Sequence, residues 1–183
     1  MRKLSLLMLL VAMVGCDGED VGRDQAPVLS EDPPYGLAEI DMPKTGDELV
    51  AALERLPAID GRQPTVTREG DLVFVVYEGT TLPHDNWSMW VFLDVAVESE
   101  WFIDSLRQGI VDAEEEGRIV EASDLDPSDD LVWVAENRTE GGTTTFGMTW
   151  ADPSDLGPSY SVTGDTADFR LKLVHAFIGA VGD

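Results

Sequence analysis

The fold is organised around the stretch Leu72-Val73-Phe74-Val75-Val76-Tyr77, which is an unbroken apolar run. A run of this length, rich in β-branched and aromatic residues, is typical of a strand that is buried on both faces. Just before it, Thr65-Val66-Thr67 alternates between polar and apolar positions, and Glu69-Gly70 can turn the chain between the two segments. We therefore expect a hairpin here, with its second strand in the centre of a sheet.

A helix is expected before this hairpin and a third strand after it. Thr45 and Glu48 have the spacing of a capping box, and apolar residues follow at helical intervals until Pro57, which should end the helix. After the hairpin, the heavy apolar residues between Trp87 and Val97 indicate the third strand.

The second half of the chain gives a helix and a second hairpin. Ser99 can cap a helix whose apolar residues recur at helical spacing, and Gly117 is placed to end that helix. The segments Leu131–Asn137 and Thr143–Trp150 then have the pattern of two strands. One face of this hairpin should be buried and the other hydrated.

The chain ends in the most regular helix of the sequence. A polar loop is expected from Ala151 to Gly164, and Asp165 is a suitable N-cap for the helix. The wide apolar face of this helix consists of Phe169, Leu173, Val174, Phe177, Ile178 and Val181. The order α-β-β-β-α-β-β-α predicts a single α+β domain, with three helices packed on an antiparallel sheet of about five strands.

From about Pro43 to Asp183, this order of elements resembles the type III secretion chaperone-like fold, which also occurs in small bacterial proteins without a role in secretion. The resemblance rests on element order alone, so it assigns no site residues. A pleckstrin-like or lipid-transfer-like sheet with a long C-terminal helix is the alternative.

The N-terminal residues have the pattern of an export signal. Arg2 and Lys3 precede an apolar run of about a dozen residues that ends at Gly15. A secretory signal needs a run of this length, whereas a membrane-spanning helix needs roughly 20 residues. The pattern therefore favours export over a permanent span.

The end of that run, Met13-Val14-Gly15-Cys16, resembles the lipobox of bacterial lipoproteins. The resemblance implies that residues 1–15 are a signal peptide, and that Cys16 is lipidated and becomes the acylated amino terminus. Two or more acyl chains give stable anchoring, so the protein should be held in the cell envelope by palmitate-type chains, at the inner or the outer membrane. The alternatives are a plain secretory peptide and a buried apolar helix.

Residues 16–42 have the composition of an acidic, disordered tether. Eight carboxylates and three prolines lie between Asp17 and Met42, and the apolar residues follow no period. Such a segment buries too little surface to offset its ordering entropy. In the alternative, part of it packs on the domain as an arm through Tyr35, Leu37 and Ile40. The globular domain is expected at residues 43–183.

The charge balance of the chain is strongly acidic. There are 36 aspartates and glutamates against 12 lysines and arginines, which gives a net charge of −24. A surface of this kind repels nucleic acid phosphates, and we therefore exclude nucleic-acid binding. The surplus fits either a solubility or salt adaptation, or a surface for cations or for a basic protein partner.

The sequence indicates no cofactor. Cys16 is the only cysteine, so its lipidation leaves no disulfide, no thiolate nucleophile and no cysteine ligand for zinc or iron. The only histidines, His84 and His175, are far apart in sequence.

One acidic loop is a candidate cation site. Calcium prefers several oxygen ligands from a flexible loop, and four carboxylates lie close together at Asp124, Asp126, Asp129 and Asp130. The loop is not an EF-hand, because Asp129 stands where that motif needs glycine and Ala135 where it needs glutamate.

A second polar loop holds the other candidate residues. His84 and Asp85 could form an acid–base pair, and the neighbouring Trp87 could anchor a partner. The leading hypothesis is a non-enzymatic, lipid-anchored envelope protein whose domain binds a protein or another ligand. The alternatives are an envelope enzyme that uses a carboxylate and a histidine, and a cation-binding domain.

Overall fold

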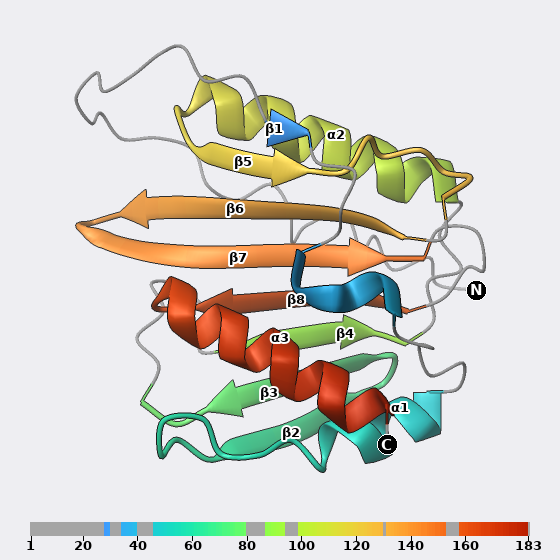
Figure 1. The fold of residues 1–183 in the computed structure, drawn as a ribbon, viewed down its shortest axis with the longest axis vertical. Helices are drawn as coiled ribbons and strands as arrows, with labels where there is room; N and C mark the ends of the chain where they lie inside the picture. Colours follow the sequence, from blue (N-terminus) through green and yellow to red (C-terminus); the bar gives the residue numbers. More distant parts are fainter. Residues whose placement is uncertain are drawn as a thin grey trace.

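The computed structural model of the protein describes residues 28–29, 34–39, 46–79, 87–93, 99–129, 131–152 and 158–182. Within these ranges, three α-helices and an eight-stranded sheet form an α+β fold (Figure 1). The predicted fold class is therefore confirmed.

The helices are α1 (Gly46–Leu53), α2 (Ser99–Glu115) and α3 (Ala167–Gly182), with a short 3-10 helix η1 (Pro34–Glu39). The strands are β1 (Val28–Leu29), β2 (Pro64–Glu69), β3 (Leu72–Tyr77), β4 (Met89–Phe92), β5 (Ile119–Ala122), β6 (Val132–Glu140), β7 (Thr143–Ala151) and β8 (Ser159–Gly164).

The strands lie in the order β1-β5-β6-β7-β8-β4-β3-β2. β1 pairs with β5 in parallel, and the other neighbours pair antiparallel. Both predicted hairpins are present, as β2–β3 and β6–β7. The predicted count of about five strands is wrong, because β1, β5 and β8 are not among the predicted strands.

Strand β8 is the most consequential of these corrections. It lies within Ala151–Gly164, where a polar loop is predicted, and it joins the two predicted hairpins by pairing with β7 on one side and β4 on the other. Tyr160 and Val162 are buried and alternate with serine and threonine. The small polar residues of this strand make a weak sequence signal, and its two neighbouring strands supply most of its stabilisation.

The apolar stretch that led to the fold is strand β3, and its burial alternates along the strand. Val73, Val75 and Tyr77 are fully buried, whereas Leu72, Phe74 and Val76 are half-buried. The strand lies beside the edge strand β2. The expectation of a strand buried on both faces is therefore confirmed for one face and wrong for the other, where Leu72, Phe74 and Val76 are only half-buried.

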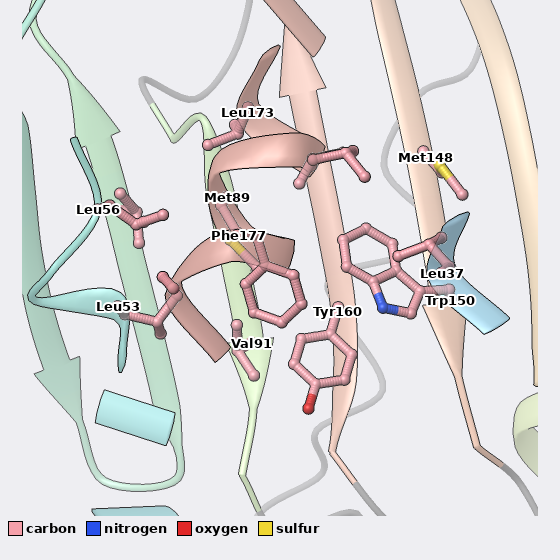
Figure 2. Close-up of a cluster of buried hydrophobic side chains, with 14 of the residues drawn as sticks. Leu37, Leu53, Leu56, Met89, Val91, Met148, Trp150, Tyr160, Leu173 and Phe177 are labelled. Carbon is pink, nitrogen blue, oxygen red and sulfur yellow. The ribbon is translucent and has the colours of Figure 1, made fainter. Parts of the chain in front are cut away.

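One face of the sheet, here called the covered face, packs against α1, α3 and η1 (Figure 1). Its centre is an aromatic cluster in which the ring of Phe177 from α3 lies 5.6 Å from that of Trp150 and 5.1 Å from that of Tyr160. Figure 2 shows these three rings side by side. The helices therefore close the covered face and form the main core.

The 3-10 helix η1 also contributes to this core. Leu37 is only 2% exposed and belongs to the main cluster, and Tyr35 packs against it. The Arg170 guanidinium donates hydrogen bonds to the Tyr35 hydroxyl at 3.1 Å and to the Gly147 carbonyl at 3.0 Å. Tyr35 and Leu37 thus pack as the arm of the alternative interpretation, although they lie within the segment assigned to a tether.

Side chains outside α3 fix both ends of this helix. The Phe169 amide donates to the Thr166 hydroxyl at 3.0 Å, so Thr166 caps the helix, and the predicted cap Asp165 instead pairs with Arg62 at 3.0 Å. At the other end, the Arg55 guanidinium donates to the Ala180 carbonyl at 2.6 Å. A cation at this end also complements the helix dipole.

Among the described residues, fewer helices cover the other face of the sheet, here called the second face. Helix α2 packs on it at the β5–β6 end, where Ile103, Leu125 and Val132 form a small buried cluster. The helix ends as predicted at Gly117, which has a φ of 69°. Further along this face, the cross-strand register places small polar residues of β7 and β8 next to large apolar residues of β4 and β3.

Candidate partner-binding surface

A group of half-buried apolar side chains lies on the second face over β3 and β4. We call this group the aromatic surface, and it consists of Leu72, Phe74, Val76, Trp87, Trp90 and Phe92. None of its members belongs to either buried hydrophobic cluster. They therefore remain partly open to solvent in a protein that buries Val73, Val75 and Val91 completely on the covered face.

The register of the strands explains why these side chains gather. Leu72 pairs with Phe92, and Phe74 pairs with Trp90, so that two rows of large side chains cross β3 and β4 on the same face. Directly opposed residues in neighbouring strands are in side-chain contact. The alternation that buries Met89 and Val91 on the covered face therefore directs Trp90 and Phe92 to the second face.

Contacts between the rings hold the aromatic surface in place. The ring of Trp87 lies 4.5 Å from that of Phe74 in a tilted arrangement, and the ring of Trp90 lies 5.1 Å from that of Phe92 with its plane at 90°. Aromatic pairs at such distances stabilise each other beyond simple burial. These ring contacts thus hold the side chains in a defined arrangement.

Three exposed carboxylates border the aromatic surface, and we call them the acidic rim: Glu69, Asp71 and Glu78. Glu69 is in register with Leu72, and Asp71 immediately precedes Leu72 in the β2–β3 turn. Glu78 follows β3 two residues after Val76. The nearest arginine of β2, Arg68, is in register with Val73, and it pairs with Asp47 at 3.1 Å.

The basic side chains of the described residues all have partners within the protein. Five of them form ion pairs with aspartate or glutamate, as Arg62 does with Asp165 and Lys172 with Asp60. Another, Arg138, lies 3.7 Å from a Glu140 oxygen. Arg55 donates a hydrogen bond to the Ala180 carbonyl of α3, and Arg170 of α3 donates one to the Gly147 carbonyl of β7. Since the chain has 36 acidic residues and only 12 basic ones, its own lysines and arginines cannot neutralise all of its carboxylates.

The structure describes some of the candidate residues from the sequence and leaves out others. Cys16, His84, Asp85 and Asp130 lie outside the described residues. Trp87 is described, is half-buried and belongs to the aromatic surface. The other histidine, His175, is exposed on α3 with its ring 6.0 Å from that of Tyr35, so it is part of the contact between η1 and α3.

The acidic loop is built around a buried leucine. Leu125 is 2% exposed, and its carbonyl accepts a hydrogen bond from Arg107 of α2 at 3.0 Å. The Asp126 carboxylate accepts hydrogen bonds from the hydroxyl and the amide of Ser128, and these bonds lower the pKa of Asp126. Among the described residues, no group of three or more potential ligands could hold a metal. Because Asp130 is not described, the four-carboxylate site stays a prediction.

Sequence reasoning missed most of the aromatic surface. The apolar pattern places Trp90 and Phe92 in a strand, but it does not show which face of the sheet they occupy. The alternation of Met89, Trp90, Val91 and Phe92 shows that two of these residues share a face, but it does not show which face the helices cover. Trp101 on α2 was missed in the same way, and it is 51% exposed.

No protein-family model, no curated protein and no solved structure matches this chain. Within the described residues, no helix is both long enough and apolar enough to span a membrane.

Proposed function

We propose that this protein is a non-enzymatic, lipid-anchored protein of the cell envelope whose acidic α+β domain binds a protein partner. The anchor is proposed from Met13-Val14-Gly15-Cys16, which follows a short basic segment and an apolar run of the length of a secretory signal. Lipidation of Cys16 would hold the protein at a membrane surface.

The observation that carries the binding role is the aromatic surface with its acidic rim. Apolar groups that gather on one face, stay partly open to solvent and are bordered by polar residues are typical of interaction sites. The carboxylate surplus supports the binding of a basic partner, because the basic residues of the described part are already engaged within the fold.

The anchor is tested by labelling cells that express the full chain with radioactive palmitate. Label should be incorporated into the wild type and lost from Cys16→Ala, and the wild type should fractionate with membranes while the variant does not. A signal-peptide variant that keeps the cysteine, Met13→Leu, is the matched control and should be labelled at least as well as the wild type. Equal labelling of wild type and Cys16→Ala would contradict the anchor.

A further inference from the structure

We propose that the aromatic surface and the acidic rim together dock a basic segment of a protein partner, one that carries lysine or arginine beside aliphatic or aromatic side chains. The inference rests on the proposed function, since it assigns the site and the chemistry of the partner that the domain binds. It places the binding site on β3 and β4, and it specifies that the bound segment is positively charged.

The apolar part of the partner is inferred from the aromatic surface itself. Phe74, Trp90 and Phe92 are half-buried side chains on strands, and their ring contacts already fix their positions. A partner that covers them removes apolar area from water without a large cost for ordering the side chains. Tryptophan is also among the residues that most often dominate the energy of an interface.

The charge of the partner is inferred from the acidic rim. Glu69, Asp71 and Glu78 are exposed, and the neighbouring Arg68 is engaged with Asp47. A lysine or arginine of the partner can therefore approach these carboxylates without displacing an internal cation. The same cation can also lie over an aromatic ring, which favours arginine or lysine over a neutral side chain.

The net charge argues against other occupants of the surface. Two copies of this chain would each carry a net charge of −24, so their approach is opposed by repulsion between like charges. Nucleic acids are repelled for the same reason. A basic peptide segment is attracted over a long range, and its binding should weaken as salt screens the charges.

The proposal is tested with short synthetic peptides and the purified full chain. The probe is a peptide of alternating lysine and leucine, and the control peptide alternates lysine and serine, so that the two carry the same charge. Binding is followed by isothermal titration at low and at physiological salt. We expect the lysine–leucine peptide to bind about tenfold more tightly than the lysine–serine peptide, since only it covers the aromatic surface.

Two sets of matched variants locate the site. In the rim variant, Glu69→Gln, Asp71→Asn and Glu78→Gln are combined, and the control combines the same number of neutralised carboxylates on α2 and β5: Glu114→Gln, Glu115→Gln and Glu121→Gln. We expect the rim variant to weaken binding about tenfold and the control to weaken it about twofold or less, because only the rim charges are close to the peptide. Far-ultraviolet circular dichroism checks that both variants fold.

A second pair of variants tests how much the aromatic surface contributes to peptide binding. Trp87→Ala should weaken binding of the lysine–leucine peptide about tenfold, whereas Trp101→Ala, at an exposed tryptophan on α2, should leave it unchanged. If Trp87→Ala fails to fold, the two charge variants still decide the question.

Three results would overturn the proposal. They are equal weakening by the rim and control charge variants, equal affinity for the two peptides, and self-association of the chain in sedimentation experiments without any peptide binding. The last result would make a second copy the occupant. None of these results affects the palmitate experiment, so the docking site and the anchor fail independently.

Discussion

The two faces of the sheet are made by the same strands but have different environments. In β3, Val75 is fully buried on the covered face, and its neighbour Val76 is half-buried on the second face. The covered face meets α1, α3 and η1, whereas α2 packs on the second face at its β5–β6 end. The comparison teaches that an apolar strand does not define a core by itself, because the position of the helices decides which side becomes core and which side stays partly open to solvent.

The largest difference is expected between two phenylalanines, one on each side of the sheet. Phe177→Ala should lower the free energy of unfolding by about 3–5 kcal/mol, because the fully buried ring packs against Trp150 and Tyr160 and its removal leaves a cavity. Phe74→Ala should cost about 1 kcal/mol, since this ring is half-buried beside Trp87. Urea denaturation measures both values. Equal losses in the free energy of unfolding would contradict the difference between the two faces of the sheet.

The next contrast concerns two glycines of neighbouring strands. A methyl group at Gly164 would lie 2.8 Å from the Thr166 carbonyl oxygen and 2.9 Å from the Arg170 amide nitrogen, which are backbone atoms at the start of α3. Gly164→Ala should therefore destabilise the protein by about 2 kcal/mol. At Gly147 the nearest atom would be the Glu136 side chain at 3.6 Å, an ordinary contact.

Gly147→Ala serves as the control for that experiment. It should change the stability by about 0.5 kcal/mol or less, or raise it slightly, because alanine restricts the unfolded chain. Thermal unfolding of the two variants is sufficient to compare them. A Gly164→Ala protein as stable as Gly147→Ala would show that the start of α3 shifts without cost.

A smaller effect is expected within the covered face, between two buried tyrosines. The Tyr77 hydroxyl donates to the Pro57 carbonyl at 2.9 Å, so Tyr77→Phe should destabilise the protein by about 1 kcal/mol. The Tyr160 hydroxyl is buried and has no hydrogen-bond partner among the described residues. Tyr160→Phe should therefore be neutral or stabilising, and urea denaturation that shows the reverse order would contradict this assignment.

The smallest effect is a loss of stability at alkaline pH. Burial raises the pKa of Tyr77 from 10.0 to about 12, so the neutral form is favoured in the folded state. This contribution is complete below pH 10 and is lost as the pH rises from 10 towards 12, because the unfolded chain releases the proton first. Between pH 8 and 10.5 the wild type should lose about 0.8 kcal/mol more than Tyr77→Phe, measured by urea denaturation at each pH. Parallel slopes for the two proteins would contradict the raised pKa.

The sequence predicted those elements whose signal is local. The two hairpins, α2 and α3 all have a periodic pattern of apolar residues or a turn between adjacent strands, and each lies close to its predicted position. Gly117 ends α2 as expected, since its left-handed conformation is a property of the local backbone.

The missed elements depend on contacts that are distant in sequence. Strand β8 is held between β7 and β4, and β4 lies far from it along the chain. Strand β5 has only four residues and pairs with β6 on one side and β1 on the other. A short strand with small or mixed side chains has little pattern of its own, so its assignment requires knowledge of its neighbours.

The candidate site could be predicted only in part. Trp87 was identified because it follows a polar loop, which is a local signal. Phe74 and Trp90 could not be assigned to a surface, because their role depends on α3 packing against the opposite face of the same strands. The acidic surplus was visible in the composition, but the internal engagement of Arg62, Arg170 and Lys172 becomes clear only in three dimensions.

The packing of η1 on the covered face has a mechanical consequence. Because Leu37 is inserted in the main core and Tyr35 is bonded to Arg170, a force applied to the N-terminal end of the chain reaches the domain through these contacts and through the pairing of β1 with β5. Traction from the proposed membrane anchor would therefore reach β1 at the edge of the sheet first, and η1 on the covered face after it. The aromatic surface lies on the opposite face of the sheet, so the proposed partner would bind away from the contacts of η1 that carry this load.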